Sequence, residues 1–277
     1  MRLFRLTNAD GAKYDLQNKS NVMFFDPEGL GYDEDTSYQK IGSQFAVIED
    51  VLKQHQISGT LVFNGTDCNT KFYNFVRFAR KAPLILEYTA DEKFFIKCRM
   101  SKISKTENIN NKKLICPVVF TALGIFYRES YQINDATISG GKVYDYTYPY
   151  QYSSTLAQTV EITSDSINDS PCKITIYGEA INPRWNHYVD GKLVATGSMD
   201  GTVQENHKLI IDSTSIPYQI KEFDLANRLI ADRYPFCDYS TERFCFLQYG
   251  KNRFTISHEG TNQIKVMVEA QLEYESV

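Results

Sequence analysis

Short runs in which apolar and polar residues alternate recur along the whole chain, and this pattern most limits what the chain can fold into. Alternation with a period of two places one face of a strand in a core and the other face in solvent. Lys265–Tyr274 is a clear example, and Ile57–Phe63 is strand-like by composition. Turn residues separate the runs, as in Val189-Asp-Gly-Lys192, which is typical of a β-hairpin. The sequence therefore predicts a mainly β protein.

One segment of the first half has a different period. Between residues 71 and 80, apolar side chains recur at the spacing of one helix face. Thr70 is a suitable N-cap residue, and Pro83 is expected to end the helix. We therefore expect one amphipathic helix at about residues 70–81, packed on a sheet.

The spacing and composition of the strand candidates divide the chain into three parts. Residues 1–130 are predicted to form a β-barrel or β-sandwich domain that carries the helix. Residues 131–155 are predicted to connect the two domains, since they include Gly140-Gly141 and a stretch with Tyr at every second position. Residues 156–277 contain short strand candidates with turns between them, which favours a β-sandwich.

Charge and hydropathy exclude several classes of function. The net charge of the 277 residues is −4, and the Lys and Arg residues form no cluster. A nucleic-acid-binding protein normally carries a basic stripe, so specific nucleic-acid binding is not expected. The longest apolar run, Leu114–Tyr127, is too short to span a bilayer, so no membrane association is expected. The first residues lack the apolar core of a signal peptide, which predicts synthesis in the cytoplasm without one.

The six cysteines form no C-x-x-C pair, so they are expected to be reduced and mostly buried. If Cys98 and Cys116 lie in one hairpin, position 98 faces about residue 122 and position 116 faces about residue 104. The two sulfur atoms are then too far apart to bridge.

Other patterns give no catalytic or metal site. Asp26-x-Glu28 begins like a calcium loop, but Leu30 and Ser37 stand where that loop needs oxygen ligands. His187 has Asp190 and Ser198 nearby in sequence, without a nucleophile motif. We therefore expect no enzyme, no cofactor and no bound metal.

The ordered set of motifs resembles a known family. In the first half it comprises Phe25–Tyr32, Ile57–Phe63, a helix rich in Phe, and Leu114–Tyr127. In the second half Pro171–Gly178 and Leu247–Phe254 continue the series. Together they resemble the distal tail proteins of siphophages that infect Gram-positive bacteria, with a galectin-like C-terminal β-sandwich.

This resemblance implies a structural function. Members form a hexameric hub ring at the tail tip that leaves a channel for DNA. The ring joins the tail tube protein to a tail-associated spike protein, and its C-terminal domains can carry receptor-binding proteins. The expected location is the tail tip of a virion or of a phage-tail-like bacteriocin (tailocin), with the chain made in the host cytoplasm.

Residues 26–42 are the candidate ring interface. Their glycines permit a bend away from the barrel, and their apolar side chains can anchor on a neighbour. We expect this segment to extend as an arm over the adjacent subunit, although a plain surface loop fits the same residues. The interface candidates are Pro27, Glu28, Gly29, Leu30, Gly31, Tyr32 and Tyr38.

The alternative function is a glycan-binding adhesion module that recognises cell-wall polysaccharide. Its candidate contacts are Trp185, Asn182 and His187, because aromatic and amide side chains are typical of sugar sites. A Trp in the core or at a protein interface is the stronger interpretation of Trp185.

Overall fold

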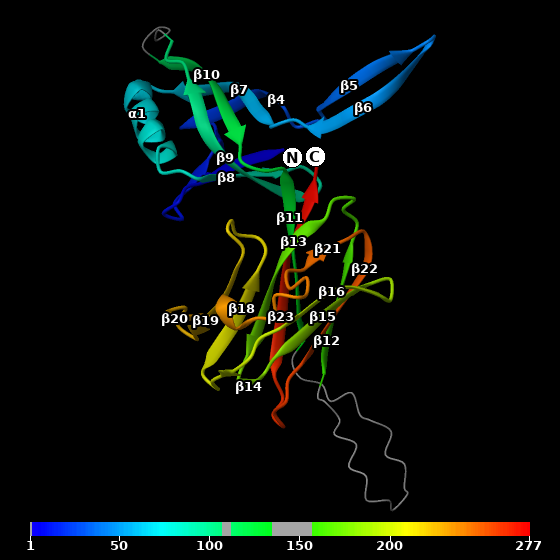
Figure 1. Ribbon diagram of the computed structural model, residues 1–277. Coiled ribbons are helices and arrows are strands. Elements are labelled where there is room, and N and C mark those ends of the chain that lie inside the picture. Colours follow the sequence, from blue (N-terminus) through cyan, green and yellow to red (C-terminus); the bar gives the residue numbers. More distant parts are fainter. Residues whose placement is uncertain (1, 107–111, 135–156) are drawn as a thin grey trace, which may run out of the picture. The chain divides into compact units, whose positions relative to one another are not determined.

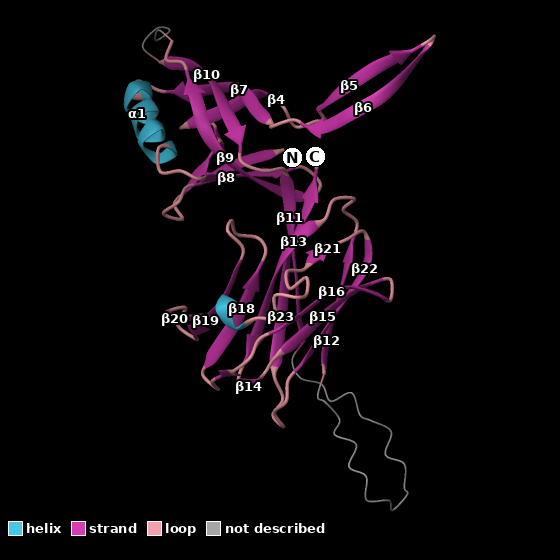
Figure 2. Cartoon of the chain, viewed as in Figure 1, coloured by secondary structure: helices cyan, strands magenta, loops and turns pink. Residues whose placement is uncertain are grey.

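The computed structural model describes residues 2–106, 112–134 and 157–277, and it is mainly β (Figures 1 and 2). The strands pair with one another in antiparallel fashion in the described part of the chain. Contacts divide the chain into a first unit, residues 1–128 with 274–277, and a second unit, residues 129–273. The domain limits predicted from the sequence, 1–130, 131–155 and 156–277, remain a prediction. Residues 135–155 of the predicted connection lie outside the described residues.

The first unit contains a barrel whose strands return to their starting point. From β1 the pairing runs through β8, β9, β10 and β7 to β4. Leu16 closes the circle, because its N–H donates to the carbonyl of Phe4 in β1 and its carbonyl accepts from Phe24 in β4. The strands are β1 (Leu3–Thr7), β2 (Lys13–Asp15), β3 (Gln17–Asn18), β4 (Val22–Glu28), β7 (Gln56–Asn64), β8 (Leu84–Thr89), β9 (Lys93–Ile103), β10 (Lys113–Ala122) and the start of β11 (Phe126–Asn134).

The interior of this barrel is filled by the apolar residues of the alternating pattern. Phe4 and Phe24 meet edge to face with ring centroids 5.1 Å apart, a favoured aromatic geometry. Phe63 meets Phe72 and Phe75 of the helix at 5.9 and 5.8 Å. The helix therefore supplies part of the core.

The helix α1 (Cys68–Ala79) begins two residues before the predicted start. The expected cap at Thr70 is wrong, since Asp67 is the N-cap residue and Thr70 lies in the first turn. Asp67 makes no side-chain cap bond; its carboxylate instead pairs with Lys71, 2.9 Å away. The predicted apolar face is confirmed, because Phe72, Phe75 and Ala79 are buried.

The second unit contains two main sheets. The four-stranded sheet has the order β12, β22, β15, β16, and the other runs through β20, β19, β18, β13 and β23. One face of each sheet is buried, as the alternate burial of β12 and β23 shows, which is the pattern of packed sheets. The galectin-like identity of this unit stays a prediction. Its strands are β12 (Gln158–Ser164), β13 (Ser170–Tyr177), β14 (Ala180–Ile181), β15 (Arg184–Val189), β16 (Lys192–Ser198), β17 (Thr202–Val203), β18 (His207–Asp212), β19 (Gln219–Asp224), β20 (Leu229–Asp232), β21 (Phe246–Leu247), β22 (Gly250–Ser257) and β23 (Lys265–Tyr274), with a 3-10 turn η1 (Tyr234–Phe236).

Two local predictions are confirmed. Asp190 and Gly191 both have positive φ angles, 47° and 85°, between the paired residues Val189 and Lys192, as a tight hairpin turn requires. Cys98 pairs with Ala122 across the two strands, and all six cysteines are buried and form no disulfide bond.

Candidate functional site: a projecting hairpin and its base

A two-stranded hairpin projects from the barrel of the first unit (Figure 1). It consists of β5 (Glu34–Ile41) and β6 (Gln44–Leu52), which pair only with each other. The pairing runs from Glu34 opposite Leu52 to Ile41 opposite Gln44. All nine residues of β6 are exposed. An isolated two-stranded hairpin is marginally stable in water, so this one is suited to pack against another surface.

The arm predicted at residues 26–42 is thus only half of the projecting element. Residues 26–28 end β4, residues 29–33 form a linker, and the remainder is β5. The run Phe45–Glu49, which is strand-like by composition, belongs to the second strand of the hairpin. Strand propensity located it correctly, but local sequence does not specify which strands form the compact domain.

Large apolar side chains on the hairpin face solvent. The exposed fractions are 62% for Tyr38, 69% for Phe45, 58% for Val47 and 64% for Ile48. Contiguous exposed apolar surface is typical of a protein interaction site, and long exposed strand edges otherwise promote aggregation. The hairpin therefore has the composition of an interface.

Charge is concentrated in the half of the hairpin that is nearest to the barrel. Asp35 and Asp50 lie there, beside Glu34 and Glu49, and Lys53 pairs with Asp33 at 3.5 Å. The pKa of Tyr32 is raised to about 12, first by its hydrogen bond to the Glu34 carboxylate. The tip half carries Lys40 as its charged residue.

The linker is fixed to the barrel. Gly29 has a φ of +83°, and a Cβ added to it would lie 2.0 Å from the carbonyl oxygen of Gln56. Leu30 packs against the barrel core, and its carbonyl accepts a hydrogen bond from Val277 N–H at 3.0 Å. Leu30 is therefore an anchor within its own chain, whereas it was predicted to anchor on a neighbour.

The other interface candidates are placed around this linker. Pro27 is half-buried in β4, and Glu28 accepts a hydrogen bond from the Ser58 hydroxyl at 3.2 Å. A Cβ added to Gly31 would meet no atom within 4 Å, and Tyr32 is 58% exposed. Tyr32 joins Tyr38 as a candidate whose side chain is accessible to a partner.

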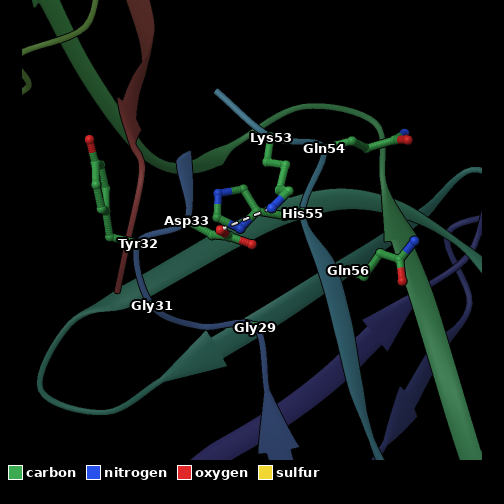
Figure 3. Close-up of a pocket in the computed structure, with 8 residues that line it drawn as sticks. All are labelled: Gly29, Gly31, Tyr32, Asp33, Lys53, Gln54, His55 and Gln56. Carbon is green, nitrogen blue, oxygen red and sulfur yellow. Dashed lines mark hydrogen bonds and ion pairs between the residues drawn. The ribbon is translucent and has the colours of Figure 1, made fainter. Parts of the chain in front are cut away.

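A polar cavity of about 670 Å³ lies at the base of the hairpin, between residues 29–33 and 53–56 (Figure 3). His55 is 5% exposed, and its Nε2 has no hydrogen-bond partner among the described residues, while its ring meets Phe126 edge to face. Gln54 donates to the carbonyl of Ala122 at 2.8 Å, which ties the end of the hairpin to β10. The cavity offers donors and acceptors to a polar group.

The three candidate glycan contacts do not form an exposed aromatic surface. Trp185 is 0% exposed, its ring lies against Gly197, and its Nε1 donates to the carbonyl of Arg243 at 2.8 Å. His187 is also 0% exposed and stacks on Phe254 with centroids 4.4 Å apart. Burial lowers the pKa of His187. Asn182 donates to Glu259 instead of joining the other two side chains.

Within the described ranges, no cluster of three or more His, Cys, Asp or Glu residues could hold a metal ion. The described helices are also too short or too polar to cross a membrane.

Comparison with known proteins identifies the first unit. Residues 3–123 match the family model described as distal tail protein, N-terminal domain. No curated protein matches the sequence.

Solved structures match over the whole chain. A chain of the phage P2 baseplate in its activated conformation with calcium is 14% identical, is matched over 100% of both chains, and has a TM-score of 0.68. The SPP1 Dit protein is 10% identical over 96% of this chain and 98% of that one, with a TM-score of 0.63. At these identities the matches establish a shared fold.

Proposed function

Because the chain belongs to the distal tail protein family through the domain at residues 3–123, we propose that it is a structural hub protein of a phage tail tip. It is a baseplate component of a virion or of a phage-tail-like particle, and it performs no catalysis. The fold shared with a P2 baseplate chain and with SPP1 Dit, a protein described as a paradigm of hub adsorption apparatus, supports this function.

The hub is a closed ring of six copies, and the hairpin joins each copy to the next. In a ring, each subunit presents one surface to the copy on one side and a different surface to the copy on the other. A hairpin that leaves Phe45 69% exposed in the single chain provides one such surface. This exposed hairpin is the observation that carries the proposal.

The other partners follow from the family alone. The ring joins the tail tube protein to the tail-associated spike protein and leaves a channel for DNA. The second unit is the candidate attachment point for a receptor-binding protein. The net charge of −4 suits a channel that DNA passes through without binding.

The alternative function, glycan adhesion, has weaker support. It was suggested by Trp185 and His187, and both side chains are 0% exposed. The hub predicts no saturable binding of the purified chain to cell-wall polysaccharide.

Particle mass tests the hub, by light scattering at high concentration and by negative-stain microscopy. The expected result is a ring with an open centre and the mass of six chains, whereas a strict monomer would contradict it. The triple variant Tyr38→Ser, Phe45→Ser and Val47→Ser should remove the ring, since it deletes exposed apolar contacts.

A matched control removes as many exposed apolar side chains from the second unit. Ile216, Leu225 and Leu229 are 94%, 58% and 56% exposed. Their replacement by Ser should leave the ring intact. A hairpin variant that still forms rings would show that the hairpin is not the joining element.

A further inference from the structure

The outer surface of one barrel wall is unusually apolar for a surface that faces solvent. The wall consists of β4, β7, β10 and β9, and its register places Met23, Val62 and Ile115 in one row across the strands. The next row contains Phe25, Thr60 and Pro117. The alternate residues Phe24, Leu61 and Cys116 are buried in the core, so these two rows lie on the outer side.

This outer surface is accessible in the single chain around Phe25, which is 43% exposed, and Pro117, which is exposed. Ile115 is intermediate, and Val62 beside it is buried. A soluble barrel normally places polar residues at such positions, because alternate side chains of each strand point into solvent. A partner surface that covers Phe25 would remove this apolar area from water.

Basic residues border the apolar rows on β9. Thr121 of β10 pairs with Arg99, and Val119 pairs with Lys102; both basic residues are exposed. Glu28, an acidic residue of the same wall, lies on β4, the strand farthest from β9, and pairs with Ser58 of β7. The wall is therefore apolar around Phe25 and Pro117, acidic at Glu28 and basic along β9.

The hairpin carries the complementary order of groups on one of its faces. Residues at alternate positions of β5 share a face with their partners on β6. Tyr38 pairs with Val47, and next to the tip Phe45 pairs with Lys40. Nearer the barrel, on this same face, Asp50 pairs with Thr36 and Leu52 pairs with Glu34. The face is thus mostly apolar at the tip, where Lys40 adds a positive charge, and acidic toward the barrel.

The spacing of the two patterns agrees. Phe45 and Asp50 lie opposite Lys40 and Thr36, because β6 has a bulge between them. Lys40 and Thr36 are four residues apart, about 13 Å at roughly 3.3 Å per residue. The distance across the wall from β4 to β9 is three strand spacings, about 14 Å at roughly 4.8 Å each. A hairpin that crosses the strands can place Phe45 over Phe25 while Asp50 faces Lys102.

We propose that the outer wall of β4, β7, β10 and β9 is the surface on which the hairpin of a neighbouring copy docks. The apolar tip covers Phe25 and Pro117, and Glu34 and Asp50 pair with Arg99 and Lys102. This docking surface rests on the ring of the proposed function, and it specifies which two surfaces of the subunit meet.

Cross-linking between two differently tagged chains tests the contact. One chain carries Phe45→Cys and the other carries Pro117→Cys, and the rings are assembled from the mixture and treated with a short bis-maleimide. The expected product is a cross-linked pair that contains both tags. The six native cysteines are buried, so the unmodified chain provides the background.

A matched control places the acceptor cysteine at Tyr73 of α1, which is 56% exposed. Rings that form without the Phe45–Pro117 product, or that cross-link equally well to position 73, would overturn the docking surface and leave the hub intact. A wild-type chain that forms no ring would overturn the hub itself.

Charge reversal tests the basic border. The variant Glu34→Lys and Asp50→Lys should lower the fraction of chains in rings at least tenfold, and Arg99→Glu with Lys102→Glu should do the same. A chain with all four changes should recover rings, because the opposite charges again meet. Reversal of the exposed Lys192 in the second unit should have no effect. Failure of the combined chain to recover would contradict the charge pairing.

Discussion

Replacement of Gly29 by Ala should destabilise the first unit through the base of the hairpin. Gly29 has a φ of +83°, and its added Cβ would lie 2.0 Å from the carbonyl oxygen of Gln56 and 2.9 Å from the carbonyl carbon. A left-handed conformation costs a non-glycine residue about 1–2 kcal/mol. Overpacking that forces a backbone shift costs a further 1–3 kcal/mol, roughly.

The sum is about 2–5 kcal/mol, because the clashing atoms belong to the backbone of β7 and cannot rotate away. Urea unfolding followed by far-UV circular dichroism measures the loss of stability. Hydrogen exchange of peptides that cover residues 56–58 locates it at the start of β7. Fluorescence of Trp185 does not report this change, since that residue lies in the second unit.

Gly31 provides the matched control two positions along the same linker. A Cβ there meets no atom within 4 Å, so Gly31→Ala should change the free energy of unfolding by less than about 0.5 kcal/mol. If the two variants had equal stabilities, the predicted clash of a Cβ at position 29 with the backbone of β7 would be refuted. The view that the linker fixes where the hairpin leaves the barrel would fall with it.

Three further outcomes are expected. Gly197→Ala places a Cβ 2.4 Å from the ring of Trp185 and should destabilise the second unit by about 1–3 kcal/mol, with a changed Trp emission; an unchanged spectrum and midpoint would contradict it. Glu34→Gln should lower the pKa of Tyr32 from about 12 toward 10, as measured by NMR of labelled tyrosine. In the native chain the Tyr32 phenol is protonated below about pH 12 and ionises only as the pH rises through that value. The thiol of Cys98, whose burial raises its pKa to about 12, should not react with an aromatic disulfide reagent at pH 8 until urea unfolds the chain, so rapid labelling of the folded protein would argue against this burial.

Much of the first unit is readable in the sequence. The run Ile57–Phe63, strand-like by composition, lies in β7, and the helical spacing around Phe72 and Phe75 identifies the buried face of α1. The start of α1 was misplaced because Thr70 and Asp67 are both cap-forming residues, and helix packing rather than a cap bond decides between them.

The candidate interface was only partly readable. Gly29 and Tyr32 indicated the linker from the sequence alone. Glycine permits a bend in the backbone, and aromatic residues are typical of interfaces. The run Phe45–Glu49 gave a correct strand but no sign that this strand leaves the barrel. The turn at Gly42-Ser43 would have been a sign of a projecting hairpin, because it lies between two strand-like runs. Both runs carry acidic residues at the ends that are farthest from the turn.

The sequence by itself determined that this chain is mainly β, where most of its strands lie, and that its cysteines are buried and not in disulfide bonds. These properties depend on the period of apolar residues and on turn residues, which act over a few positions. Only the tertiary structure decided that Trp185 is buried, that β5 and β6 project from the barrel, and that Phe25 and Pro117 share an outer wall. Those results depend on which strands pair and in which register, and these contacts join residues far apart in the chain.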